Sequence, residues 1–184
     1  MKAATIATER RVPGPIAMQL EYSLVARDVE AEHIPAAREA GMGVMPWSPL
    51  AGGFLTGKYT RGNTADTGRL SGANPFGDSK FVDRNWDILD TLTAVAAEID
   101  RPPAQVALAW AMARPGIGST LVGARTVSQI ESNIAATSIR LSAQQMNRLD
   151  DASAPTLGFS ASLAQPMIRR MIFGGHDVVG WGEA

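Results

Sequence analysis

Apolar residues along the chain fall into short unbroken runs and into longer segments with helical spacing. Short runs at 16–20, 43–47 and 119–122 are typical of buried strands. From apolar spacing, capping residues and helix breakers, we expect helices over residues 3–11, 28–40, 85–99, 104–114, 126–136 and 142–151. An irregular tail is expected from Pro155 onward.

Local signals refine two of these helices. Pro35 lies inside the segment 28–40, so its regular helix is expected to begin only near Ile34. Thr126 and Gln129 have the spacing of a capping box, which predicts the start of a helix at Thr126.

Strands separated by helices indicate parallel βα units in an α/β fold. The chain offers about three such units, whereas a TIM barrel needs eight. The connection at 48–84 is long, and long connections in compact domains are usually functional or mobile.

Composition narrows the classes of function. The net charge is −1, which argues against nucleic acid and against an anionic membrane surface as partners. The chain has no cysteine and two histidines far apart in sequence, so no metal site is expected. Because no apolar run reaches membrane-spanning length and the N-terminus lacks the apolar core of a signal peptide, we expect a cytoplasmic protein.

The stretch Trp47–Tyr59 is the strongest candidate for chemistry. It reads as a strand end that opens into a turn rich in Ser, Pro and Gly. An indole there offers a flat face for stacking, and small residues such as Gly52 let a backbone approach a ligand closely. Lys58 supplies a cation for a bound anion. Taken singly, a core Trp and an ordinary glycine turn are the more common readings.

A second candidate is the segment from Val122 to Asn133. Arg125 lies between a predicted strand and a helix N-terminus, where N–H groups and the helix dipole favour an anion. Gln129 and Asn133 project from the same face of the expected helix. By local pattern alone, a surface Arg, a capping Gln and a solvated Asn are favoured.

The whole string W-S-P-L-A-G-G-F-L-T-G-K-Y at 47–59 resembles that of the aldo/keto reductase family, where it follows the seventh strand of a TIM barrel. The string V-G-A-R-T at 122–126, with Gln129 and Asn133, is similar to the family segment that holds the 2′-phosphate of NADP. One position departs: the family often has an acidic residue before this Asn, and here it is Ser132.

The resemblance covers nearly the whole chain but only the second part of the family's barrel. It implies a single partial domain over 1–184, a partial TIM (β/α)8 barrel with strands six, seven and eight plus a C-terminal helix and tail. It implies NADP as cofactor, with Trp47 stacked on the nicotinamide and the following turn around the pyrophosphate. The implied cofactor-binding residues are Gln19, Trp47, Ser48, Pro49, Leu50, Ala51, Gly52, Lys58, Arg69, Gly123, Arg125, Gln129 and Asn133.

Two of these residues also have an interpretation without a role in binding. Gln19 is implied to bind the nicotinamide carboxamide, and otherwise reads as a buried amide bonded to backbone. Arg69 is implied to approach the pyrophosphate, and a solvated loop Arg is an equal reading. Tyr22 is expected to be a packing residue at the barrel rim.

The family's reaction uses a Tyr acid with a Lys, an Asp and a His, all from the half of the barrel that this sequence does not contain. No catalytic residue is therefore assigned. We expect an NADP-dependent oxidoreductase portion, acting on a small carbonyl only if completed, and inactive as an isolated chain. The alternatives are a non-catalytic dinucleotide-binding module and a nonfunctional remnant. Uncovered sheet edges also predict self-association or a complementing chain.

Overall fold

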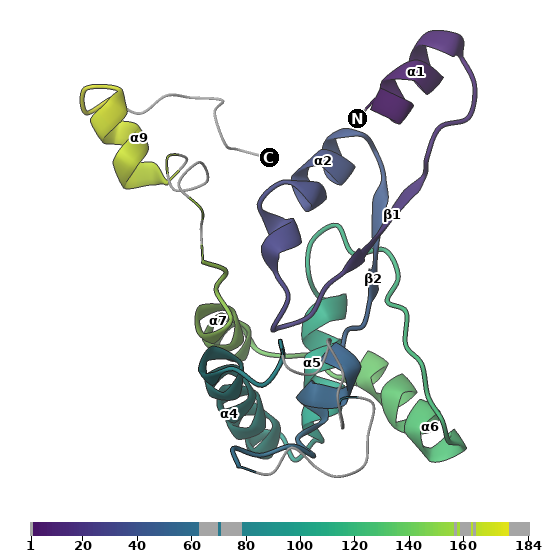
Figure 1. Cartoon of the computed structure of the whole chain (residues 1–184), viewed down its shortest axis with the longest axis vertical. Helices are drawn as coiled ribbons and strands as arrows, with labels where there is room; N and C mark the ends of the chain where they lie inside the picture. Colours follow the sequence, from purple (N-terminus) through teal and green to yellow (C-terminus); the bar gives the residue numbers. More distant parts are fainter. Residues whose placement is uncertain are drawn as a thin grey trace.

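The computed structural model describes residues 2–62, 70, 79–156, 158, 163 and 165–176, with a small parallel sheet and most helices gathered toward one end of it (Figure 1). The strands are β1 (Ala17–Glu21) and β2 (Gly43–Trp47), paired in parallel with Gln19 opposite Met45. The helices are α1 (Lys2–Arg10), α2 (His33–Glu39), α4 (Asp83–Glu98), α5 (Pro103–Met112), α6 (Val127–Ala135), α7 (Ala143–Ala152) and α9 (Pro166–Ile172). Short 3₁₀ segments are η1 (Asp28–Glu30), η2 (Ala51–Thr56) and η3 (Ala136–Ser138).

The predicted strand at 119–122 is not formed, and this corrects the expectation of three strands. The segment from Ile117 instead runs beside β2 through one parallel bridge to Val44. The Gly118 N–H donates to the Val44 carbonyl at 2.9 Å, and the Leu121 N–H donates to the Pro46 carbonyl at 2.8 Å. Because Pro46 has no N–H, it cannot donate the next bond of a parallel ladder. A two-stranded sheet with a loosely attached third segment results.

β1 is more exposed than the sequence predicts. Its residues are half-buried, with Gln19 exposed, and Ile16 just before it is 85% exposed. The prediction of a buried strand at 16–20 is therefore wrong in this structure. The physical reason is that, among the described residues, β1 pairs only with β2.

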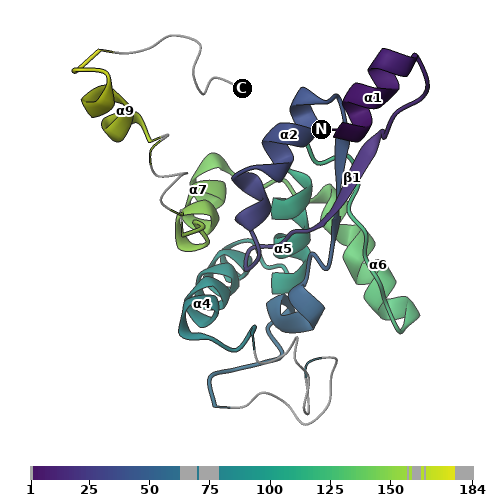
Figure 2. The same cartoon turned by 45° about the horizontal axis from the view of Figure 1, so that its top comes forward.

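The predicted helices are confirmed with shifts of one or two residues at most of their ends. The regular part of the first long segment begins at His33, two residues before Pro35, and ends before Gly41, whose φ is +66°. The tail, expected to be irregular, contains α9. Figure 2 shows α9 apart from the other helices.

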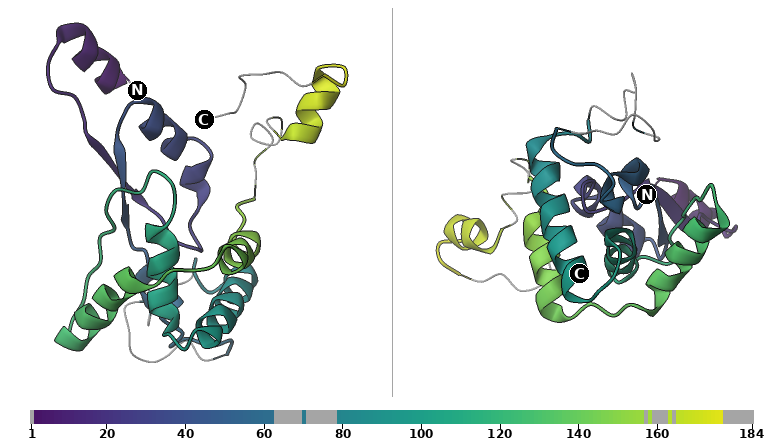
Figure 3. Two further views of the ribbon diagram at one scale, coloured as in Figure 1. Left: turned by 180° about the vertical axis from the view of Figure 1, so that it is seen from behind. Right: turned by 90° about the horizontal axis from the view of Figure 1, so that it is seen from below.

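The core lies where α4, α5 and α7 pack together beneath the loop that follows β2. In Figure 3, α5 lies between α4 and α6, with α7 alongside α4. Trp110, Leu92 and Phe54 are fully buried there, and Phe54 packs on Trp86 with ring centroids 4.9 Å apart. This core packs against the loop that follows β2, through Phe54 on η2.

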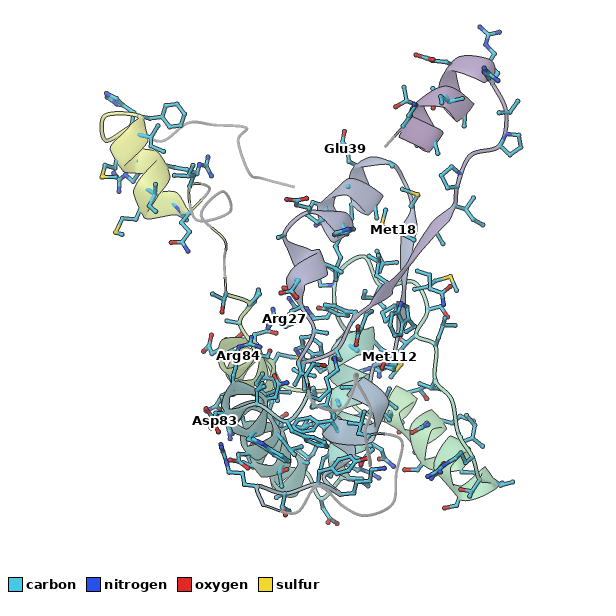
Figure 4. All side chains as sticks on the ribbon, in the orientation of Figure 1. Met18, Arg27, Glu39, Asp83, Arg84 and Met112 are labelled. Carbon is cyan, nitrogen blue, oxygen red and sulfur yellow. The ribbon has the colours of Figure 1, made fainter. Side chains whose placement is uncertain are left out.

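A cluster of charged side chains joins α7 to the rest of the fold. The Arg27 guanidinium donates to both carboxylate oxygens of Glu30, each at 2.9 Å. Asp150 accepts from the indole N–H of Trp110 at 2.9 Å and from Arg114 at 2.6 Å. Figure 4 shows Arg27 beside α7, where the segment after β1 meets this helix. The cluster holds α7 against α5.

Tyr22 completes this cluster from the end of β1. It is fully buried, as expected for a packing residue, and stacks on Trp110 with centroids 5.4 Å apart. Its hydroxyl donates to Glu30 at 2.5 Å. Burial, together with the hydrogen bond and charge of Glu30, raises the pKa of Tyr22 well above its usual range. Tyr22 is therefore a structural side chain with its proton held in place.

Candidate functional site

A pocket of about 840 Å³ lies beyond the C-terminal end of β2. In parallel α/β proteins this is the end of the strands where ligands bind. One side of the pocket is the loop after β2, and the other is the segment that leads into α6. Its lining residues are Trp47, Ser48, Pro49, Leu50, Gly52, Gly53, Thr56, Lys58, Ala104, Leu121, Val122, Gly123, Ala124, Arg125, Gln129, Ser132 and Asn133.

The loop after β2 turns sharply through a series of residues with positive φ. Ser48 has φ of 54°, Ala51 of 50°, Gly52 of 67° and Gly53 of 97°. For the two residues with side chains, this conformation costs about 1–3 kcal/mol each. Such strain concentrates at ligand-binding sites, so its presence beside the pocket supports a binding role for the loop.

The two glycines of the turn lie against other side chains. A Cβ on Gly52 would lie 2.8 Å from Cδ2 of Leu70, and a Cβ on Gly53 would lie 3.3 Å from Nζ of Lys58. The Lys58 ammonium also lies 4.8 Å from the ring centroid of Tyr59. The turn therefore brings an exposed cation against bare backbone, where an anionic group can approach.

The opposite wall is built by the N-terminus of α6. The Thr126 hydroxyl accepts from the Gln129 N–H at 3.2 Å and caps the helix. The Gln129 side chain accepts from the Arg125 N–H at 2.8 Å, so the predicted capping pair forms with its second bond shifted by one residue. The amide of Gln129 thus holds the backbone at Arg125, whose exposed side chain lines the pocket.

The electrostatics of the pocket are simple. Among the described residues, Lys58 and Arg125 are the charged side chains in its lining, and it holds no Asp, Glu, His or Tyr. The chain as a whole has a net charge of −1, so this positive pocket is a local feature. Trp47, 42% exposed at the strand end, adds a flat apolar surface beside the cations. The arrangement suits a ligand with both anionic and aromatic parts.

Most residues singled out from the sequence line this one pocket, with three exceptions. Ala51 is fully buried under the turn and does not line it. Gln19 lies on the exposed side of β1 and is not part of the lining, so its predicted contact with the nicotinamide is not supported. Arg69 lies outside the described residues.

Sequence reasoning missed several lining residues. Gly53, Thr56, Val122 and Ala124 lie within the two motif strings and Leu121 directly precedes the second, so the strings themselves were the signal.

Two further residues needed the tertiary structure. Ala104 comes from α5, where an alanine-rich helix gave no indication of a site, and Ser132 was noted only as a departure from the family pattern.

Neither of the two tyrosines enters the pocket. Tyr22 and Tyr59 are both buried, and neither is among the lining residues. Within the described ranges, no group of three or more His, Cys, Asp or Glu residues could hold a metal ion. In that part of the chain, no helix is both long and apolar enough to cross a membrane.

Comparison with known proteins gives a consistent result. The model of the aldo/keto reductase family matches residues 1–154. The chain is 35% identical over 151 residues to "Uncharacterized oxidoreductase YrpG" of Bacillus subtilis, covering 82% of this chain and 44% of the relative.

Two plant proteins are also similar. "Probable aldo-keto reductase 1" of Glycine max is 32% identical over 136 residues, covering 74% of this chain and 39% of the relative. "Probable voltage-gated potassium channel subunit beta" of Oryza sativa is 36% identical over 138 residues, covering 73% and 42%. The chain thus spans less than half the length of these curated relatives. The chain belongs to the aldo/keto reductase family.

Proposed function

We propose that the pocket binds NADP and that the chain supplies the cofactor part of an oxidoreductase acting on a small-molecule carbonyl. The observation that carries this proposal is the charge of the pocket lining, which among the described residues combines Lys58, Arg125 and the Trp47 indole with no carboxylate. A dinucleotide phosphate has the matching chemistry of several phosphates and two flat ring systems. When bound, its reduced nicotinamide supplies the hydride.

Each wall of the pocket has a part in this proposal. Trp47 offers its exposed face to the nicotinamide ring. The strained turn at Ser48–Gly53 and the Lys58 ammonium hold the pyrophosphate, and Arg125 holds the 2′-phosphate in a bidentate contact. Gln129 supports Arg125 by fixing its backbone N–H.

The acid–base groups of the reaction must come from elsewhere. The described part of the pocket lining has no Tyr, His, Asp or Glu to serve as the general acid or to tune it. We therefore propose that this chain alone does not turn over substrate, and that the remaining groups come from a complementing chain or from further sequence of the same protein. We also propose that the protein acts in the cytoplasm. The half-buried β1 and the exposed Ile16 beside it offer a surface for such a complement or for self-association.

The second candidate is a non-catalytic dinucleotide-binding module. The same absence of Tyr, His, Asp and Glu from the described pocket lining favours it. Family membership does not separate the two, because the relatives' names include both an oxidoreductase and a probable channel subunit. The test is whether the purified chain reduces a generic aldehyde with NADPH. Turnover would show that this chain is itself catalytic, and none is expected.

The binding proposal is tested by titrating the purified chain with NADPH and NADH and following nucleotide fluorescence. Arg125→Ala is expected to weaken NADPH binding about tenfold or more, the size of a lost charged hydrogen bond, and to leave NADH binding nearly unchanged. Arg140→Ala is the matched control, because this exposed Arg lies outside the pocket and donates to the nearby carbonyls of Thr137 and Ile139. Equal losses for both nucleotides, or no binding at all, would contradict the proposal.

A further inference from the structure

One edge of β1 is free, and the backbone shows which residues face it. The Ile16 carbonyl, just before the strand, accepts from the Gly43 N–H of β2 at 3.1 Å. Successive residues of a strand present their N–H and C=O groups to opposite edges, so the even-numbered residues of β1 face β2. Ala17, Gln19 and Glu21 therefore present their backbone groups to the other edge, with which no strand pairs among the described residues.

The chain on either side limits this edge. Pro15, which precedes it, has no N–H to donate. Beyond it, the Ser23 N–H donates to the Ala26 carbonyl at 3.1 Å, and the Ala26 N–H donates to the Ser23 carbonyl at 3.0 Å. The available edge is therefore short and centred on Gln19. Within it, β1 has no lysine and no proline, which commonly keep an edge strand from pairing.

An edge centred on one residue fits a second copy of itself. In an antiparallel pair, opposite residues at alternate positions exchange both of their backbone hydrogen bonds, and two identical strands are then related by a two-fold axis. With this axis at Gln19, each Gln19 pairs with Gln19 of the other copy, and each Ala17 pairs with Glu21 of the other copy. Every N–H and C=O group on the free edge then has a partner.

The side chains match in the same register. Met18 of each copy lies opposite Leu20 of the other, at the positions where the side chains of an antiparallel pair are closest. Both residues are half-buried in the single chain, and Ile16, which is 85% exposed, follows on the same face of the strand. Because apolar cross-strand pairs stabilise a sheet, this register covers apolar surface that the single chain leaves exposed.

The charges also favour the antiparallel arrangement. Glu21 is the charged residue of β1, and in this register it lies opposite the neutral Ala17 of the other copy. The exposed Arg10 and Arg11 precede the strand, and the exposed Asp28 follows it. Antiparallel pairing directs the basic approach to one strand toward the acidic end of the other, whereas parallel copies would bring like charges together.

We propose that the partner of β1 is a second copy of this chain, joined by antiparallel pairing of the two β1 strands about a two-fold axis at Gln19. The two small sheets then become one sheet in the order β2, β1, β1, β2. An isolated pair of strands is marginally stable in water, and a larger sheet is more stable. The proposal rests on the part of the proposed function that gives β1 a role in association. It is separate from the nucleotide pocket beyond the end of β2.

The test places charges at the two-fold axis. Sedimentation velocity of the purified chain is expected to show a dimer. Gln19→Glu and Gln19→Lys each set two like charges directly opposite one another, so each variant alone is expected to be a monomer. An equimolar mixture of the two sets opposite charges together and is expected to restore the dimer. Unfolding of a variant cannot produce this rescue, and thermal melting of each variant checks the fold.

Cysteine cross-linking tests the register, because the chain has no cysteine of its own. Gln19→Cys is expected to give a disulfide-linked dimer on mild oxidation, since opposite residues that exchange hydrogen bonds have Cα atoms about 5.5 Å apart, within the range of a disulfide. Ile16→Cys is the matched control. This position is 85% exposed, but in the proposed register its two copies lie about 20 Å apart along the strands, so little cross-linking is expected.

The other outcomes overturn the proposal. They are a monomeric unchanged chain, large aggregates without a defined dimer, a dimer that persists in Gln19→Glu, a mixture of the charged variants that stays monomeric, and faster cross-linking at Ile16 than at Gln19. None of these assays contains nucleotide. A failure here therefore leaves the NADPH titration as the test of the cofactor site, and a dimer that binds no NADPH overturns the cofactor site alone.

Discussion

Replacing Arg27 with Met tests whether the charged cluster holds α7 in place. The Arg27 side chain is 6% exposed, and its guanidinium pairs with both oxygens of Glu30. It also donates to the Asp150 carbonyl at 3.0 Å and to the Ser153 hydroxyl at 2.7 Å, and lies 5.3 Å from the ring centroid of Trp110. Met keeps the aliphatic stem and removes only the charged head.

The expected loss follows from burial. Removing one partner of a buried ion pair costs about 3–5 kcal/mol, because the other charge stays behind without compensation. Glu30 keeps the Tyr22 hydroxyl and a longer contact of 3.9 Å to Arg114, which favours the lower half of this range. Arg61→Met is the matched control. Arg61 pairs with Asp83, Asp87 and Asp90, but these carboxylates are exposed, so its loss is expected to be about 1 kcal/mol or less.

Urea unfolding followed by tryptophan fluorescence measures both variants. Arg27→Met is expected to lower the midpoint strongly at an unchanged slope, and to lower Tm by roughly 6–16 °C for a chain of this size. Arg61→Met is expected to shift Tm by only a few degrees. Equal losses in the two variants would refute the reasoning, since they differ in the burial of the pair and not in the chemistry removed.

Three further predictions test other parts of the structure. Gly53→Ala is expected to weaken NADPH binding several-fold in a fluorescence titration, because its Cβ would lie 3.3 Å from Nζ of Lys58 at a φ of +97°; unchanged affinity would show that Lys58 is not held there for the ligand. Ser142→Ala removes the capping box formed with Gln145 and is expected to cost about 0.5–2 kcal/mol in urea unfolding, whereas an unchanged midpoint would mean that packing alone fixes the start of α7. Burial raises the pKa of Tyr22 in the folded state, so the protonated hydroxyl contributes fully to stability below the unfolded pKa of about 10, and this contribution is lost as pH rises above that value. Tyr22→Phe is therefore expected to lessen the fall in the free energy of unfolding measured between neutral and strongly alkaline pH. Parallel pH profiles of the two proteins would argue against this role of Tyr22.

The order and kind of the elements could be predicted from the sequence because their signals are local. The strand at 43–47, the late start of the helix near Ile34 and the threonine cap of α6 all appear within a residue of where the pattern places them. Most residues of the candidate pocket could also be predicted from the sequence, because two contiguous strings supply most of its lining. Local signals of this kind need no knowledge of which segments become neighbours.

Tertiary neighbours decided the rest. The run at 119–122 has a strand-like pattern, but Pro46 on the adjacent strand cannot donate to it, so no regular ladder forms. The apolar residues around Gln19 in the sequence predict a buried amide. Among the described residues, however, β1 pairs on one side only, and Gln19 is exposed. A hydrogen bond from the Gln105 amide to the Ser132 hydroxyl joins residues 27 positions apart. A sequence determines the preferences of each segment, whereas burial and hydrogen-bond partners depend on which segments meet in space.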